Sequence, residues 1–148
     1  LVLLTPRTEA IYTAAALAMV GPTALLAYDA GEWDPAADFD ALLGRLAPDQ
    51  ASLVGTGLLV LQEWTLGFTG FTELSRDDQI ARLEAWRTGS LGLHRSVWGV
   101  IHAGACSSFS SRSVGWRVMG YPGPCLATDG PGRPPGQTAP FVWDPEVP

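Results

Sequence analysis

Proline placement is the feature that most constrains how this chain can fold. Up to residue 120 there are four prolines, each at a point where a helix can begin or must end. Thr5-Pro6 and Asp34-Pro35 pair a capping residue with a proline at the first helical position, and Pro48 can open another helix. Gly21-Pro22 predicts a helix end. Residues 1–120 are therefore expected to form one helical domain.

Apolar residues between these points recur at steps of three and four, as in amphipathic helices. A capping sequence at Ser75 precedes a helix with Ile80, Leu83 and Trp86 facing inward, and Gly120 ends a last turn of helix. Gly55 and Gly57 lie inside a predicted helix, where close helix packing would tolerate them. The expected fold is all-α, a compact bundle of about five helices. The predicted segments are 6–20, 35–46, 48–68, 76–88 and 90–109 with a short turn at 114–119, and the last long helix has Leu93, Val97, Ile101, Ala105 and Phe109 on one face.

The sequence changes character after Gly120. Eight of the twelve prolines fall within residues 121–148, which favours an extended, polyproline-like conformation. The same segment contains Phe141 and Trp143, large apolar side chains that a solvated tail does not need. We interpret residues 121–148 as an extended arm that packs on a partner.

The composition limits the function classes. Charged residues make up 16% of the chain, against roughly 25% in an average domain, so its surface should retain apolar patches for a partner. The net charge of −6 excludes the electrostatic attraction that drives nucleic-acid binding. The chain has no lysine and no asparagine, which excludes a P-loop lysine, a Schiff base and N-glycosylation. The uncharged stretches 10–28 and 51–62 are interrupted or short, and we interpret them as buried helices.

Candidate catalytic groups are few. His102 and Cys106 stand four residues apart, but two ligands do not make a metal site, and we interpret them as a packed histidine and thiol. His94 is expected to form a hydrogen bond on a helix face. The serine-rich segment 107–111 lacks a nucleophile elbow and is explained by capping at a helix end. No dinucleotide fingerprint is present, so no cofactor is expected in this chain.

A distinctive motif occupies residues 113–124, where a turn of helix bearing Trp116 runs into Gly-Tyr-Pro-Gly-Pro at 120–124. This segment resembles the end of the gluconate 2-dehydrogenase subunit 3 family. The opening at 4–9 and the middle, from Phe71 to Leu83 and from Arg95 to Ser111, are also similar to that family, so the resemblance spans most of residues 4–124.

The resemblance implies a non-catalytic small subunit of a hetero-oligomeric oxidoreductase complex. Its partner would be a large FAD-dependent dehydrogenase of the glucose-methanol-choline (GMC) type, which holds the FAD and the catalytic residues and oxidises a sugar or another alcohol. The small subunit of this family stabilises the flavoprotein and escorts it through twin-arginine export, and a cytochrome subunit can complete the complex. A periplasmic or cell-envelope location, with peripheral membrane association through the complex, is implied by the resemblance alone, since no twin-arginine signal is read in these residues.

The partner contacts are expected at the motif and in the arm. Pro122 and Pro124 fix the exit direction of the chain, so little entropy is lost on docking. The alternative is a turn that serves only this chain's own fold. The expected interface residues are Trp116, Tyr121, Pro122, Gly123, Pro124, Phe141 and Trp143.

The two cysteines leave three arrangements open. An exported setting, as the resemblance implies, favours disulfides. Cys106 and Cys125 can both be free thiols, they can form a disulfide with each other, or one of them can form a disulfide with the partner.

Two other functions compete with the subunit hypothesis. One is a metal-dependent enzyme that uses His94, His102 and Cys106. The other is a membrane-associated or lipid-binding module that uses the uncharged helices.

Overall fold

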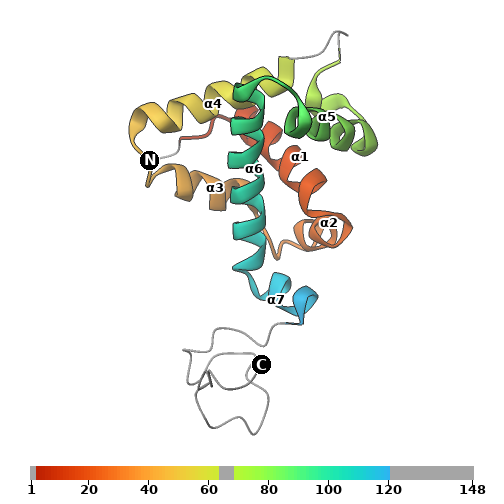
Figure 1. Ribbon diagram of the computed structural model, residues 1–148. Helices are drawn as coiled ribbons and strands as arrows, with labels where there is room; N and C mark the ends of the chain where they lie inside the picture. The colour runs from red at the N-terminus through yellow and green to blue at the C-terminus, as the bar shows by residue number, and fades with distance from the viewer. Residues whose placement is uncertain (1–2, 64–68, 121–148) are drawn as a thin grey trace, which may run out of the picture.

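The computed structural model describes residues 3–63 and 69–120, which form seven α-helices and one 3₁₀ turn with no strand among them (Figure 1). The prediction of an all-α fold is confirmed, while the predicted arm lies outside the described residues. None of the described helices is both long and apolar enough to cross a bilayer. The elements are α1 (Pro6–Val20), α2 (Pro22–Asp29), α3 (Pro35–Leu43), α4 (Pro48–Glu63), η1 (Phe71–Glu73), α5 (Arg76–Thr88), α6 (Gly92–Ser110) and α7 (Ser113–Met119).

Two long helices organise the domain. Helix α6 runs through the middle of the molecule and contacts α1, α3, α4, α5 and α7, while α1 crosses it and also contacts α2 (Figure 1). The buried face of α1 combines Ile11 and Tyr12 with alanines at 15, 16 and 18, which let its neighbours approach closely. Large side chains from the surrounding helices then fill the core. Its members include Ile11, Tyr12, Ala15, Ala16, Trp33, Phe39, Leu43, Leu58, Leu61, Phe71 and Ile101.

The helix starts predicted from capping residues are confirmed. Each capping side chain accepts a hydrogen bond from a backbone N–H of the first turn, which has no partner within the helix. The bonds are Thr8 N to Thr5 Oγ1 (3.3 Å), Ala37 N to Asp34 Oδ1 (3.0 Å) and Asp78 N to Ser75 Oγ (3.2 Å).

The Gly21-Pro22 pair ends α1 as predicted, but a second helix begins at once. Gly21 has φ 110° and ψ −174°, a conformation that favours glycine, and this single residue redirects the chain. Pro22 then takes the first position of α2, where its fixed φ is helical. The expected number of about five helices was therefore too low.

Two side chains predicted to face inward are exposed. Ile80 is 43% exposed because Gln79 has the inward position of α5, where its Nε2 donates to the carbonyl of Phe71 at 3.1 Å. Leu93 is 50% exposed because His94 has the inward position of α6 and stacks on Trp86. The rest of each predicted face is buried, with Leu83 and Trp86 on α5 and Val97, Ile101, Ala105 and Phe109 on α6. The pattern fails only at the first position of each face, where a neighbouring polar side chain finds a buried partner.

The two glycines of α4 differ in their surroundings. A Cβ on Gly57 would lie 2.6 Å from Cγ2 of Val97, so α4 and α6 pack there as closely as expected. A Cβ on Gly55 would meet nothing within 4 Å. Gly55 instead lines a hollow of about 600 Å³ beside Pro48 and Leu59, so close packing does not explain this second glycine.

Candidate functional site

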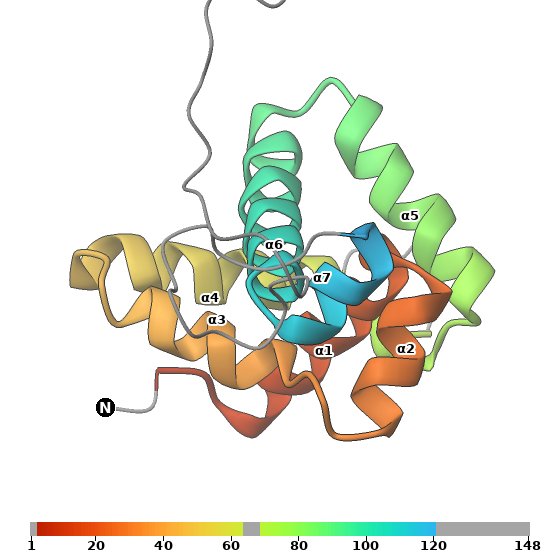
Figure 2. The same ribbon diagram turned by 90° about the horizontal axis from the view of Figure 1, so that it is seen from below.

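Helix α7 lies across the end of α6 and beside α2, where it forms a corner of the molecule (Figure 2). Gly115 makes this approach possible, because a Cβ there would lie 2.1 Å from the carbonyl oxygen of Phe109. Any side chain at this position would push α7 away from α6. Gly120 then ends α7 in the left-handed conformation, with φ 67° and ψ 19°, as predicted for the helix stop.

Polar contacts fix the position of α7. The indole of Trp116 donates to the carbonyl of Ser110 at 2.7 Å, which ties α7 back to α6. Arg117 forms an exposed ion pair with Glu32, which follows α2 in the chain. Exposed ion pairs contribute little stability, so the Trp116 contact and the packing at Gly115 are the stronger constraints.

A chain of hydrogen bonds anchors the end of α6 to α3. The indole of Trp33 donates to Ser108 Oγ at 2.7 Å, and this hydroxyl donates to Asp38 Oδ2 at 2.5 Å. Arg112, just before α7, donates to both oxygens of Asp38. These bonds and the charge of Asp38 raise the pKa of the Arg112 guanidinium. The corner is thus attached to the core through α3 as well as α6.

Two other serines of the serine-rich segment act at the helix end, as predicted. Ser110 Oγ donates to the carbonyl of Ser107 at 3.2 Å, and Ser111 Oγ donates to the carbonyl of Ser108 at 2.8 Å. Both hydroxyls satisfy carbonyls of the last turn of α6. The segment therefore closes a helix.

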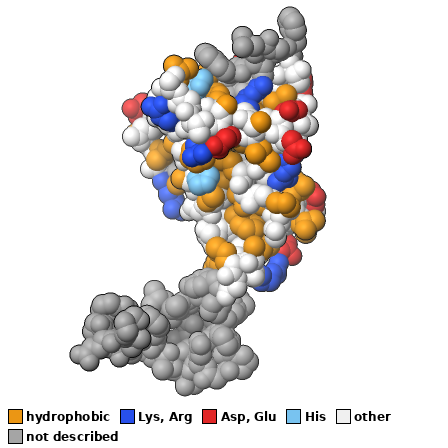
Figure 3. Space-filling model, turned by 45° about the vertical axis from the view of Figure 1, so that its right-hand side comes forward, with side chains coloured by type: hydrophobic (Ala, Val, Ile, Leu, Met, Phe, Trp, Pro, Cys, Tyr) orange, Lys and Arg blue, Asp and Glu red, His pale blue; other side chains and the backbone are white. Residues whose placement is uncertain are grey.

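Apolar side chains are exposed on both helices of this corner. Leu26 on α2 is 69% exposed and Met119 on α7 is 57% exposed, and Tyr28 and Val118 are exposed beside them in sequence. In Figure 3 hydrophobic side chains gather on the lower part of the described surface. We call Leu26, Tyr28, Val118 and Met119 the α2–α7 surface. Because α2 and α7 are in contact, these four exposed side chains make the α2–α7 surface a candidate contact surface.

Of the interface residues predicted from sequence, the structure places only Trp116. Its side chain is half-buried at the α6–α7 corner, close in sequence to the α2–α7 surface. The predictions at Tyr121, Pro122, Gly123, Pro124, Phe141 and Trp143 all lie outside the described residues. Sequence reasoning did not find Leu26, Tyr28, Val118 or Met119, because an apolar residue on a short helix gives no signal of its exposure.

His102 and Cys106 pack side by side on α6, as predicted. The ring of His102 stacks on Trp98 with centroids 4.6 Å apart, and its Nε2 lies 3.5 Å from Sγ of Cys106. Burial raises the pKa of the Cys106 thiol. No group of three or more His, Cys, Asp or Glu side chains within 3–63 and 69–120 could hold a metal ion. The possible partner Cys125 lies outside the described residues, so the disulfide stays a prediction.

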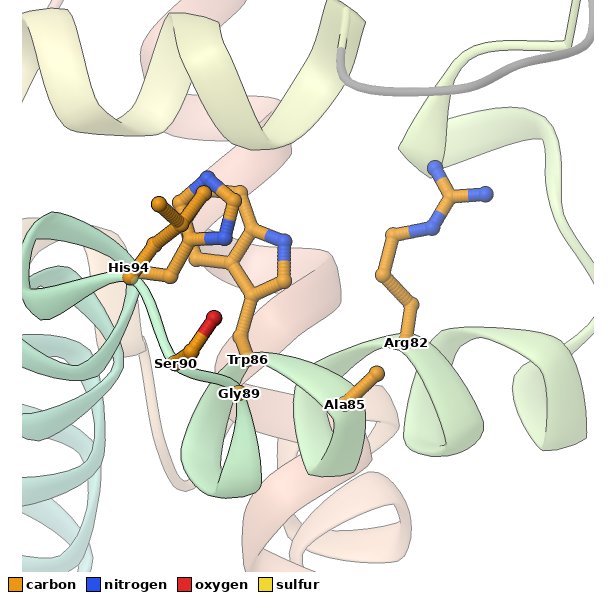
Figure 4. A pocket seen from close by; sticks show the side chains of 7 residues that line it. Arg82, Ala85, Trp86, Gly89, Ser90 and His94 are labelled. Atoms are coloured by element: carbon orange, nitrogen blue, oxygen red, sulfur yellow. The ribbon is translucent and has the colours of Figure 1, made fainter.

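A pocket of about 320 Å³ lies at the turn between α5 and α6 (Figure 4). Its wall includes Trp86 and His94, whose rings stack in parallel with centroids 4.2 Å apart and an interplanar angle of 2°. Arg82 stands at one side of the pocket. The buried His94 is thus a stacking partner of Trp86, and sequence reasoning missed the pocket because its residues belong to two helices.

Comparison of the chain with protein-family models, curated proteins and solved structures finds no match.

Proposed function

We propose that this chain is a non-catalytic subunit that binds and stabilises a larger FAD-dependent dehydrogenase of the GMC type. The observation that carries the proposal is the α2–α7 surface. Four exposed apolar side chains lie on two contacting helices, and one of these helices, α7, directly precedes the Gly-Tyr-Pro-Gly-Pro segment in sequence. The family resemblance is most distinctive in that same segment, so the motif follows the exposed end of α7 directly in sequence.

The construction of the corner supports a docking role. Gly115, the indole of Trp116 and the hydrogen bonds of Asp38 hold α7 in one position before any partner arrives. A preorganised surface loses little conformational entropy on binding, so more of the contact free energy appears as affinity. The partner would contribute the complementary apolar surface, the FAD and the catalytic groups. Twin-arginine export with the partner, a cell-envelope location and a cytochrome subunit belong to the same proposal.

The contribution of the α2–α7 surface can be expressed as a change in the affinity of the chain for its partner. Val118 and Met119 are about half exposed, and burying the remaining area of each would contribute about 1–1.5 kcal/mol. Removing both should therefore weaken the complex by about 30-fold to 150-fold. Neither side chain belongs to the buried core of the described residues, so their replacement should leave the fold intact.

The test is a gentle purification of the tagged full chain from its native source, with the visible spectrum of the eluate recorded. We expect a flavin spectrum and a co-purifying chain several times larger. The double variant Val118→Ser/Met119→Ser should lose most of that chain. The matched control is Leu53→Ser, which removes an equally exposed leucine from α4, away from α7.

Two outcomes would contradict the proposal. One is a colourless, solitary chain from the native source. The other is a flavoprotein complex that the double variant retains as fully as the Leu53→Ser control does, since the α2–α7 surface would then not be the contact. Partition of the lone chain into liposomes would instead support a lipid-binding module.

A further inference from the structure

Arg82 is in an unusual position for an arginine of this chain. Four other arginines, Arg7, Arg87, Arg112 and Arg117, form ion pairs with carboxylates. Arg76 and Arg95 donate to backbone carbonyls, of Leu17 and Gly89 respectively. Nη1 of Arg82 is buried, and within residues 3–63 and 69–120 it has no hydrogen-bond partner.

The surroundings of Arg82 leave its charge poorly compensated. Asp78, one turn earlier on α5, is the acid that acts electrostatically on Arg82, but one oxygen of this carboxylate already accepts from Ser75 Oγ at 2.6 Å. Desolvation by burial lowers the pKa of Arg82 despite the opposing effect of Asp78. A partly desolvated guanidinium gains free energy when an anion reaches its accessible edge.

A second donor faces the same space. Figure 4 shows the nitrogen-bearing edge of the Trp86 indole on the side of the ring nearer to Arg82. The parallel stack on His94 holds this ring in place. Arg95, whose Nη1 donates to the carbonyl of the pocket residue Gly89 at 2.6 Å, adds a second positive charge at the turn. Ala85 and Leu91 supply apolar lining between these groups.

We propose that this pocket binds a carboxylate, with one oxygen on the guanidinium of Arg82 and the other on the indole N–H of Trp86. Carboxylates match the planar fork of arginine and can accept from a second donor at the same time. The volume of about 320 Å³ suits a short organic acid or one acidic side chain. This site is at the opposite end of α6 from the α2–α7 surface and does not rest on the proposed function (Figure 1).

The test uses the ¹⁵N-labelled full chain and the indole N–H signal of Trp86, assigned through Trp86→Phe. Sodium propionate is titrated against sodium chloride at equal ionic strength. We expect a saturable shift of the Trp86 signal and of the Arg82 Nε–H signal with propionate alone. The Trp33 and Trp116 indoles, which donate to groups elsewhere in the chain, should stay unchanged.

Two arginines of α5 provide matched variants. Arg82→Gln should raise the dissociation constant for propionate at least tenfold. Arg87→Gln should leave it unchanged, because Arg87 is exposed, pairs with Glu84 and does not line this pocket. Arg82→Lys retains the charge without the planar fork and should bind with intermediate affinity, and its circular dichroism checks that the fold survives.

A second titration separates the two sources of a carboxylate. N-acetyl-glutamic acid α-amide represents an acidic side chain of a protein, and N-acetyl-glutamine amide is its neutral control. Tighter binding of the glutamic derivative than of propionate assigns the site to a protein side chain, and the reverse order assigns it to a free acid. The proposal would be overturned if the Trp86 signal shifts linearly with propionate and chloride reproduces this shift. It would also be overturned if propionate still binds Arg82→Gln saturably.

Discussion

Two glycines of α6 provide a matched test of the packing described above. A Cβ on Gly104 would lie 2.8 Å from two ring carbons of Phe39 and 2.9 Å from the hydroxyl of Tyr12. A Cβ on Gly99 would meet nothing within 4 Å. Both glycines lie inside the same helix, so alanine has the same effect on helix propensity at each.

The expected magnitudes follow from this difference. Replacing a helical glycine by alanine stabilises by about 1 kcal/mol where space allows. At Gly104 the added methyl must displace the stacked rings of Tyr12 and Phe39, which lie 3.8 Å apart and are fully buried. Overpacking of this kind costs about 1–3 kcal/mol. The propensity gain cancels in the comparison, so Gly104→Ala should be less stable than Gly99→Ala by about 1–3 kcal/mol.

Urea unfolding of the full chain, followed by far-ultraviolet circular dichroism, measures this difference. We expect the midpoint of Gly99→Ala to lie above that of the wild type, and the midpoint of Gly104→Ala to lie below that of Gly99→Ala, with similar m-values. Equal stability of the two variants would refute the reasoning, because α6 could not then approach α1 and α3 as closely as the structure shows.

Three further predictions concern buried and capping groups. The Tyr12 hydroxyl is buried without a hydrogen-bond partner in the described part of the chain, so Tyr12→Phe should stabilise by about 1 kcal/mol at neutral pH. Burial, and to a smaller extent the charges of Asp38 and Cys106, raise the pKa of Tyr12 above its ordinary value of 10.0. Only the unfolded state then releases this proton near pH 10, so the free energy of unfolding should fall by about 1.4 kcal/mol per pH unit above that value. Urea unfolding between pH 7 and 11 should show a shallower alkaline loss in Tyr12→Phe, and an unchanged slope would contradict the assignment. Ser75→Ala removes the side chain that caps α5 and should lower the free energy of unfolding by about 1 kcal/mol. Its control, Ser96→Ala on the exposed face of α6, should not lower it. Equal thermal unfolding midpoints for the two variants would show that the cap contributes no stability.

The two candidate sites lie at opposite ends of one helix. Helix α6 has 19 residues, which corresponds to about 28 Å at 1.5 Å per residue. The pocket with Arg82 is at its N-terminal end and the α2–α7 surface is at its C-terminal end (Figure 1). A partner on one site would therefore leave the other accessible, and the two proposals can be tested separately.

The boundaries of most helices could be predicted from the sequence alone. Thr5, Asp34 and Ser75 cap the backbone within their own first turn, and Gly120 ends α7 through its own φ of 67°. These signals act over three or four residues, so they do not depend on the rest of the fold. The start of α2 directly after α1 was missed, and it depends on the direction that Gly21 gives to the chain. The end of α3 was also placed three residues too late, at 46 rather than at Leu43.

Periodicity predicted most of the buried face of α5 and α6, but the tertiary structure decided the first inward position of each. Gln79 rather than Ile80 faces inward on α5 because the carbonyl of Phe71, eight residues earlier, accepts from its side chain. His94 rather than Leu93 faces inward on α6 because the ring of Trp86 lies opposite. Hydrophobic periodicity measures only whether a face is apolar, whereas burial depends on which groups a neighbouring helix presents.

The candidate sites also differ in whether the sequence or the tertiary structure reveals them. The sequence by itself identified Trp116 and the turn at Gly120 as a corner, because the motif is continuous along the chain. The α2–α7 surface and the pocket at Arg82 join residues of different helices, and each exists only because packing brings those helices together. The local chain therefore determined where the helices begin and end, and contacts between helices determined which side chains remained available to a partner or a ligand.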